Sequence, residues 1–216
     1  MKIHSVFESI NGEVSLSHQG SLCTFIRFAG CNLSCEYCDT VYAQKKESGK
    51  EMSASEIVNL CLEIGNKNIT ITGGEPLIQF SNLYALITSL SKFYISVETN
   101  GSFKIPMEWP VSWVADWKGP SSGMRNKMKL GNLSNLSSQD FIKFVIADFN
   151  DFGDAMMVVT KIVNDKKKRS APRFAFSPSY AKIDPAELVH WMSENTILKN
   201  IGAIFSLQIH KVIQVD

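Results

Sequence analysis

Stretches typical of β-strands alternate along this chain with stretches typical of helices, and this alternation limits the fold more than any other feature. We expect strands at residues 22–28, 68–72, 94–98, 112–116, 141–147, 173–176 and 203–209. We expect helices at residues 53–64, 77–90, 151–164 and 185–198, the first of them opened by a capping box of Ser53 and Glu56. Strands that alternate with helices favour a mainly parallel α/β sheet.

Two connections are too poor in apolar periodicity to hold a crossover helix. Residues 99–111 include Pro106 and Pro110, and residues 118–139 are rich in glycine and serine. The second stretch is predicted to be an irregular loop that covers a ligand. The fold class is therefore α/β, in the form of a partial, helix-poor (β/α) barrel, with active-site residues at the C-terminal ends of its strands.

Composition and charge favour one compact enzyme domain over residues 1–216. The 216 residues are 44% apolar, which is enough for a full core, and the net charge of +1 gives no sign of a nucleic-acid partner. The basic run at 166–169 is more typical of a solvated helix end. No stretch is long enough to span a membrane, and the start of the chain does not resemble a signal peptide, so we expect a cytoplasmic protein.

Three cysteines lie close together in a C-x3-C-x2-C pattern, at Cys31, Cys35 and Cys38. Thiolates with this spacing converge on one iron–sulfur cluster, and three ligands would leave one iron open to a small molecule. The alternative is a zinc site in a small interaction module, with a fourth ligand from His4, His18 or His210. The sequence lacks the second C-x2-C pair that structural zinc sites usually have. The remaining cysteines, Cys23 and Cys61, are expected to be buried.

The cysteine spacing resembles that of radical S-adenosylmethionine (radical SAM) enzymes. The resemblance implies a 4Fe-4S cluster whose open iron binds SAM, and reductive cleavage of SAM to a 5'-deoxyadenosyl radical. The string Thr72-Gly-Gly-Glu-Pro76 is similar to the motif that contacts the amino group of SAM in that superfamily. Taken by itself, this string would be an ordinary loop start. Glu98 or Asp116 alone could equally be a polar turn after a buried strand, but charges at two successive strand ends favour a site.

A longer ordered set of motifs narrows the resemblance to the 7-carboxy-7-deazaguanine synthase family. The set comprises Phe7-Glu-Ser-Ile-Asn-Gly-Glu13, Phe25-Ile-Arg27, the Cys-Asp-Thr string that ends at Thr40, Glu98-Thr-Asn-Gly101, Lys118 with Pro120-Ser-Ser-Gly-Met124, and Leu207-Gln-Ile-His-Lys211. The resemblance implies conversion of 6-carboxy-5,6,7,8-tetrahydropterin to 7-carboxy-7-deazaguanine, with loss of ammonia, on the way to queuosine and related bases. The alternative is a radical SAM activase that generates a glycyl radical on a partner protein. Such an enzyme has no evident use for Arg27 or for the string Asn11-Gly-Glu13.

The resemblance also implies a role for each site residue. The cluster ligands would be Cys31, Cys35 and Cys38, and Thr40 would bind Mg²⁺. The SAM contacts would be Tyr37, Cys38, Asp39, Gly73, Gly74, Glu75, Glu98, Asp116, Trp117, Lys118 and Ser177. The pterin contacts would be Ile10, Asn11, Gly12, Glu13, Arg27, Thr72 and His210. A homodimer and an electron donor such as a flavodoxin or ferredoxin are implied as well.

Three of these residues can also be interpreted without the resemblance. Arg27 lies among apolar neighbours, where an unpaired guanidinium is costly, so a carboxylate ligand would stabilise it. His210 taken alone would more often be a hydrogen-bonded histidine near a sheet edge. Thr40 taken alone would simply end a loop.

Overall fold

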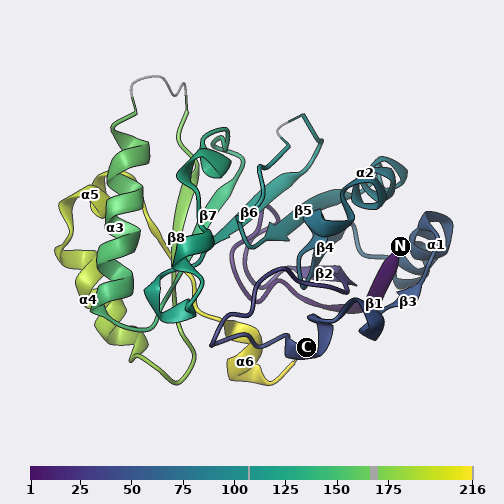
Figure 1. Cartoon of the computed structure of the whole chain (residues 1–216), viewed down its shortest axis with the longest axis horizontal. Helices are drawn as coiled ribbons and strands as arrows, with labels where there is room; N and C mark the ends of the chain where they lie inside the picture. Colours follow the sequence, from purple (N-terminus) through teal and green to yellow (C-terminus); the bar gives the residue numbers. More distant parts are fainter. Residues whose placement is uncertain (107, 166–169, 216) are drawn as a thin grey trace.

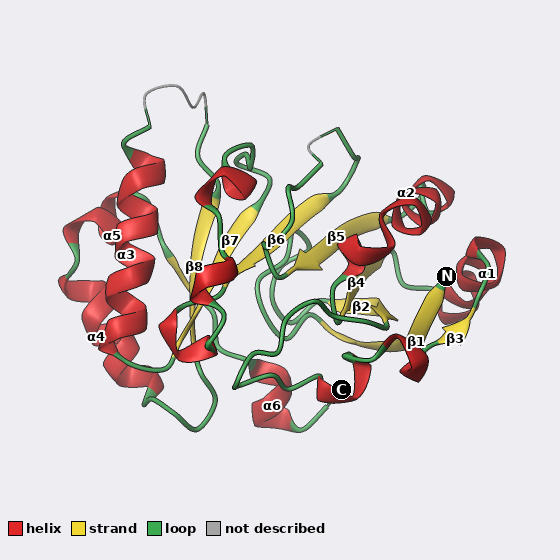
Figure 2. Ribbon diagram, in the orientation of Figure 1, coloured by secondary structure: helices red, strands yellow, loops and turns green. Residues whose placement is uncertain are grey.

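The computed structural model of this protein describes residues 1–106, 108–165 and 170–215. Within these residues nine strands form one open sheet in the order β3-β1-β2-β4-β5-β6-β7-β8-β9, which fans across the molecule in Figures 1 and 2. The strands are β1 (Lys2–Ile10), β2 (Leu22–Phe28), β3 (Lys50–Glu51), β4 (Asn68–Gly73), β5 (Tyr94–Thr99), β6 (Ser112–Trp117), β7 (Phe141–Ile146), β8 (Arg173–Pro178) and β9 (Ile204–Phe205). Neighbours from β2 to β9 pair in parallel, which confirms the predicted α/β class.

The helices gather at the two ends of this sheet. Figure 1 shows α1 (Ala54–Ile64) and α2 (Phe80–Ser89) beside the β1–β4 end, and α3 (Phe149–Val163), α4 (Pro185–Glu194) and α5 (Thr196–Asn200) beside β8. The short helix α6 (Ile209–Ile213) lies near the C-terminus. The predicted capping box is confirmed, because the Ser53 side chain accepts from the Glu56 amide and the Glu56 carboxylate from the Ser53 amide. Cys23 and Cys61 are fully buried, as expected.

The strand β1 was not predicted from the sequence. It pairs antiparallel with both β2 and β3, and most of its side chains are half-buried. Because polar residues such as His4, Ser5 and Glu8 interrupt its apolar positions, the strand lacks the alternation that would reveal it.

The strand predicted at 203–209 is wrong beyond Phe205. The Ser206 amide still donates to the Phe176 carbonyl at 2.8 Å, but the Ile209 amide donates to the Gly12 carbonyl at 3.0 Å. The chain therefore leaves β8 to meet the loop after β1, and His210 lies on α6 instead of a strand.

Two other predicted elements differ in detail. The helix expected at 185–198 is divided at Asn195, whose side chain accepts from the Leu198 amide at 3.1 Å and so begins α5. The helix expected at 77–90 starts as a 3-10 turn, Pro76–Gln79, before α2. The stretch 118–139 is irregular, as predicted, and contains short 3-10 turns at Pro120–Ser122, Arg125–Lys127 and Leu130–Leu133. The basic run at 166–169 lies outside the described residues.

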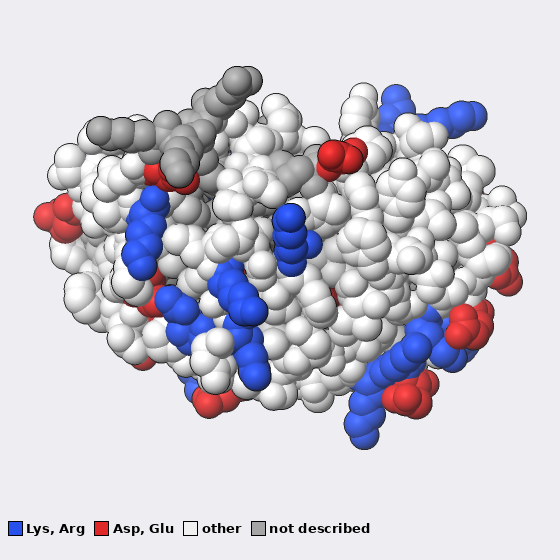
Figure 3. All heavy atoms as spheres, turned by 45° about the horizontal axis from the view of Figure 1, so that its top comes forward, with Lys and Arg blue, Asp and Glu red and all other residues white. Residues whose placement is uncertain are grey.

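The surface carries charges of both signs. On the face drawn in Figure 3, lysine and arginine side chains gather near the middle, and acidic and basic side chains lie together toward one lower edge. In the part of the chain that the structure describes, we find no helix with the length and apolar character needed to cross a bilayer.

Candidate active site

A cavity of about 980 Å³ opens over the ends of the parallel strands. Arg27 comes from the end of β2, Thr72 from β4, Glu98 from β5 and Asp116 from β6. The predicted site residues that line it are Ile10, Gly12, Glu13, Arg27, Cys31, Cys35, Tyr37, Cys38, Asp39, Thr40, Thr72, Gly73, Gly74, Glu98, Asp116, Lys118 and His210. The cavity therefore lies at the C-terminal strand ends, which is where the sequence predicts the active-site residues.

The three clustered cysteines lie on the loop that follows β2 and face this cavity as free thiols. The loop is held at its base, since the amides of Gly30 and Cys31 donate to the carbonyls of Ala43 and Gln44, each at 2.8 Å. Burial raises the pKa of Cys31 and raises that of Cys35 to about 11, and the neighbouring cysteines add to both shifts. The three thiols are therefore close enough for the ionisation of one to disfavour that of another.

The thiols do not form a site for a single ion. Among the described residues, no three Cys, His, Asp or Glu side chains are grouped closely enough to hold one metal ion. Three half-buried thiols on one loop suit a cluster of several metal atoms better than tetrahedral zinc, which needs four ligands around one point.

Two glycines allow β4 to pass directly against the start of the cysteine loop. Gly73 has a φ of 137°, and a Cβ there would overlap the backbone of Phe28. A Cβ on Gly74 would overlap the carbonyl of Gly30. This close approach lets the Gly74 amide donate to the Phe28 carbonyl at 3.0 Å and the Glu75 amide to the Gly30 carbonyl at 2.8 Å.

Glu75 does not line the cavity and is fully buried. Its carboxylate accepts from the amides of Leu77 and Asn100 and from the Thr99 hydroxyl. Burial raises its pKa to about 7, against the effect of these donors. Asn100, which the sequence reading did not assign, in turn places its side-chain amide 3.8 Å from the Cys31 sulfur.

The guanidinium of Arg27 lies in the cavity between two aromatic rings. Its central carbon is 5.5 Å from the ring centre of Phe7 and 5.7 Å from that of Tyr42. No ion pair joins Arg27 to a carboxylate within the described ranges. Its charge is therefore available to an anionic ligand.

A chain of buried charges crosses the floor of the cavity. The Asp116 carboxylate lies 2.9 Å from the Lys118 ammonium and 3.3 Å from that of Lys143, and Lys143 also pairs with Glu13. Burial opposes ionisation of Asp116, but the two lysines lower its pKa. The Gln208 side chain donates to Glu13 at 2.7 Å.

Lys143 and Gln208 were missed in the sequence reading. Lys143 could have been recognised from the sequence, because a lysine is unusual inside an apolar string such as Phe141-Ile-Lys-Phe-Val-Ile146. Gln208 was part of the motif Leu207-Gln-Ile-His-Lys211 but had no assigned role, because its stretch was predicted to be a strand.

The residues predicted to contact the pterin make close contacts with their neighbours. The Thr72 hydroxyl donates to the Glu98 carboxylate at 2.7 Å, and burial raises the pKa of Glu98. The His210 ring lies so close to Gly12 that a Cβ on this glycine would overlap it. Burial lowers the pKa of His210, so its imidazole is neutral at pH 7.

Asp39 joins the cysteine loop to α6. Its carboxylate lies 2.7 Å from the Lys211 ammonium and accepts from the Thr40 hydroxyl at 3.0 Å. Partial loss of water contact opposes ionisation, but Lys211 lowers the pKa of Asp39, whose side chain is 52% exposed, to about 2. Lys211 was part of a sequence motif without an assigned role.

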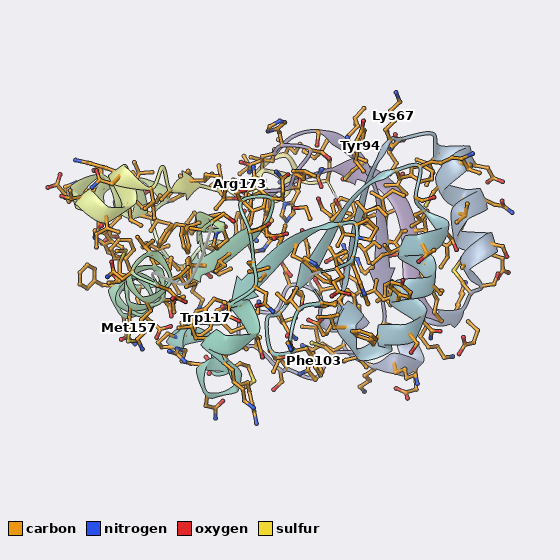
Figure 4. The ribbon with its side chains drawn as sticks, turned by 90° about the horizontal axis from the view of Figure 1, so that it is seen from above. Lys67, Tyr94, Phe103, Trp117, Met157 and Arg173 are labelled. Atoms are coloured by element: carbon orange, nitrogen blue, oxygen red, sulfur yellow. The ribbon has the colours of Figure 1, made fainter. Side chains whose placement is uncertain are left out.

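Three further predicted residues, besides Glu75, lie behind the cavity wall. Asn11 is buried and accepts from the Thr70 hydroxyl at 2.6 Å. The Trp117 indole donates to Asp154 of α3 at 2.8 Å, and Figure 4 shows Trp117 on the α3 side, near Met157. Ser177 is fully buried, and its hydroxyl has no hydrogen-bond partner among the described residues.

Comparison with known proteins connects this geometry to a family. The model of the radical SAM superfamily matches residues 25–106, a range that includes the cysteine loop and Gly73–Gly74. The crystal structure of QueE from Escherichia coli has a similar fold, with a TM-score of 0.72 and 20% identity over 95% of this chain and 92% of that one.

Relatives that match over nearly the whole length are more similar in sequence. The 7-carboxy-7-deazaguanine synthase of Methanospirillum hungatei is 34% identical, over 99% of this chain and 85% of the relative. The 7-carboxy-7-deazaguanine synthase of Clostridium acetobutylicum is 38% identical, over 98% of this chain and 95% of the relative. This chain belongs to the 7-carboxy-7-deazaguanine synthase family.

Proposed function

We propose that this protein is a radical SAM enzyme that converts 6-carboxy-5,6,7,8-tetrahydropterin to 7-carboxy-7-deazaguanine with loss of ammonia, a step toward queuosine. The names of its relatives support this reaction. The observation that carries it is the Arg27 guanidinium, which faces the cavity between two rings and has no ion pair among the described residues. A planar guanidinium binds a carboxylate through two parallel hydrogen bonds, and the pterin carries such a carboxylate.

The residues of the cysteine loop fit a 4Fe-4S cluster. Cys31, Cys35 and Cys38 would hold it, and their free thiols face the cavity where a small molecule can reach the open iron. When bound, the cluster and SAM supply a radical able to abstract hydrogen from the substrate. The protein supplies the binding and orientation of both ligands.

Several polar groups beside the cysteine loop have unused hydrogen-bonding capacity that SAM could satisfy. The Tyr37 hydroxyl and one Asp116 oxygen are buried without a hydrogen-bond partner among the described residues. Buried polar atoms are normally satisfied, so a ligand with donors and acceptors suits this wall. Lys118, 5.7 Å from the Tyr37 ring centre, would bind a carboxylate or ribose oxygen. All the SAM contacts stay predictions, including those of Glu98 and of Glu75, Trp117 and Ser177, the last three of which do not line the cavity.

The opposite wall would orient the pterin. Arg27 would hold its carboxylate, while Thr72 and neutral His210 would form hydrogen bonds with the ring edge. Thr40 would bind Mg²⁺ through its hydroxyl, since hard cations prefer oxygen ligands. A cation beside the substrate carboxylate would offset its charge.

Other properties follow from the family resemblance and are proposed on that basis. Residues 1–216 would act as one domain, would form a homodimer in the cytoplasm, and would receive electrons from a flavodoxin or ferredoxin. The five free cysteines support a reducing compartment. Light scattering of the purified protein would measure the mass of the assembly.

The reaction is tested by mass spectrometry of an anaerobic mixture of cluster-loaded protein, SAM, reductant, Mg²⁺ and 6-carboxytetrahydropterin. We expect 7-carboxy-7-deazaguanine that depends on both SAM and protein. Cys35→Ala should abolish SAM cleavage, whereas Cys61→Ala, a buried cysteine far from the loop in sequence, should retain it. Formation of 5'-deoxyadenosine without the deazaguanine would keep the radical chemistry and reject this substrate.

A further inference from the structure

Lys143 lies within β7, where every residue is buried. Its side chain is 8% exposed, and its neighbours in the strand are Ile142 and Phe144. An ammonium in such surroundings is costly unless it is paired and hydrogen-bonded. The function proposed above gives this lysine no role, so its position calls for a reason.

The ammonium pairs with two carboxylates that come from different parts of the chain. Glu13 lies in the loop after β1, and Asp116 lies at the end of β6 with Oδ2 at 3.3 Å from Nζ. Burial opposes the charge on Lys143, but these two carboxylates raise its pKa well above the ordinary value. Lys143 therefore stays charged and joins the two walls of the cavity.

The pairing also orients each carboxylate. In Asp116, Oδ2 receives both Lys143 and Lys118, which leaves Oδ1 buried and without a partner among the described residues. In Glu13, Oε2 receives Lys143 and Oε1 accepts from Gln208 at 2.7 Å. Lys143 thus sets which oxygen of Asp116 is left for a ligand.

We propose that Lys143 is a positioning residue, which fixes Glu13 on the pterin side and Asp116 on the SAM side of the cavity relative to each other. This inference rests on the proposed function, which places Asp116 beside SAM, and on the family resemblance, which implies a pterin contact for Glu13. Transfer of a hydrogen between two bound molecules requires their reacting atoms to be held close and aligned. A buried ion pair that spans both walls would provide that alignment through Glu13 and Asp116, without a contact of its own to either ligand.

Equilibrium binding to cluster-loaded protein, without reductant, tests the inference apart from turnover. The probes are SAM and 6-carboxypterin, a stable analogue of the substrate, titrated separately by calorimetry. Lys143→Met should raise the Kd of both probes by about tenfold, because Glu13 loses the only cation that pairs with it among the described residues and Asp116 keeps Lys118 alone, so neither carboxylate is held in place from the other wall. The effect on 6-carboxypterin should vanish in a Glu13→Gln background, and the effect on SAM in an Asp116→Asn background.

Further variants separate positioning from a loss of fold. Lys143→Arg keeps the charge and should restore both affinities. If Lys143→Met does not fold, the same two Kd values are measured with Lys143→Gln. Lys2→Met is the control, because Lys2 of β1 pairs at 3.5 Å with the exposed Glu51 of the edge strand β3 and does not line the cavity.

The outcomes distinguish the positioning role of Lys143 from the proposed substrate. Unchanged affinities in a folded Lys143→Met or Lys143→Gln variant would overturn the positioning role, and so would losses that persist in the Glu13→Gln and Asp116→Asn backgrounds. A wild-type protein that binds SAM but not 6-carboxypterin would instead reject the proposed substrate, and the inference with it.

Discussion

The backbone amide of Asn100 donates a 2.7 Å hydrogen bond to the carboxylate of Glu75, and the bond joins two motifs that are 25 residues apart in the sequence. The Asn100 side chain then reaches forward to the carbonyl oxygen of the Asn32 side chain at 3.0 Å. Glu75 itself lies just after Gly74, which passes against the base of the cysteine loop. The turns after β4 and β5 and the cysteine loop are therefore one connected unit.

Removal of the Glu75 carboxylate should destabilise this unit strongly. Glu75→Ala leaves the amides of Leu77 and Asn100 and the Thr99 hydroxyl without their acceptor in a buried place. Each unsatisfied group costs about 1–3 kcal/mol, so we expect a loss of about 3 kcal/mol or more in the free energy of unfolding of the cluster-free protein. Urea denaturation measures it.

Glu8→Ala is the control, because exposed Glu8 accepts one hydrogen bond from Asn66 at 3.1 Å. We expect this variant to change the stability by about 0.5 kcal/mol or less. Equal losses in the two variants would contradict the structural role of Glu75.

The raised pKa of Glu75 predicts a specific pH dependence of stability. Burial raises this pKa from 4.5 to about 7, so between these values the folded protein retains a proton that the unfolded chain has lost. The unfolding free energy should therefore fall as pH rises through this window, with a contribution of up to about 1.4 kcal/mol per pH unit. Glu75→Gln should remove this slope, as urea titrations at pH 5, 6 and 7 would reveal, and an unchanged slope would refute the assignment.

Gly73 and Gly74 should not tolerate a methyl group. Alanine at either position would overlap the backbone of Phe28 or Gly30, and at Gly73 it would also have to adopt a φ of 137°. We expect Gly73→Ala and Gly74→Ala to lose most of the bound iron after anaerobic reconstitution, as a colorimetric iron assay would show.

Gly153→Ala is a matched control, because this exposed glycine of α3 has nothing within 4 Å of an added Cβ. The variant should keep its iron and gain about 0.5–1 kcal/mol in stability. Full iron content in the Gly73 and Gly74 variants would show that the close approach is not needed.

The sequence predicted the parallel strands well because most of them are short apolar runs, two of which end in a charged residue, Glu98 or Asp116. β2, buried along most of its length, matches its predicted bounds at both ends. β1 was missed because most of its side chains are half-buried. Half-buried positions accept polar and apolar residues alike, so the sequence shows no regular alternation there. The C-terminal stretch was misread because Gln208 turns toward Glu13, a contact between distant parts of the chain.

The site shows the same division. Cysteines and glycines carry their chemistry in their spacing, so the sequence identified the residues around the cysteine loop that line the cavity. Lys143 and Asn100 act through contacts that depend on how β7 and β5 lie beside their neighbours. Such partners become evident only once the register of the sheet is known.

Thr40 should control the response to magnesium. Its hydroxyl donates to Asp39 at 3.0 Å and lines the cavity, where its lone pairs can bind a cation. Thr40→Ala should weaken the stimulation of product formation by Mg²⁺ and leave the iron content unchanged, whereas Thr40→Ser keeps the hydroxyl and should behave as the wild type. Full magnesium dependence in the alanine variant would show that the assigned role is wrong.

Lys211 should set the ionisation of Asp39 and hold α6 against the cysteine loop. Its ammonium lies 2.7 Å from the Asp39 carboxylate. Partial loss of water contact opposes ionisation, but Lys211 lowers the pKa of Asp39 to about 2 although about half of the Asp39 side chain is exposed to water. Because the folded-state pKa is depressed, the pair stabilises the protein above the ordinary pKa of 3.8, and this contribution is lost as pH falls toward 2.

Lys211→Met removes the cation, so the pKa of Asp39 should rise to its ordinary value or above, as a carbon-detected NMR titration of the carboxyl group would measure. Lys182→Met, which removes another lysine of the same cavity, should leave the pKa of Asp39 low. If Asp39 still titrates near pH 2 in the Lys211 variant, the ion pair is not what joins α6 to the loop, and the backbone hydrogen bond from Ile209 to Gly12 would have to hold the helix.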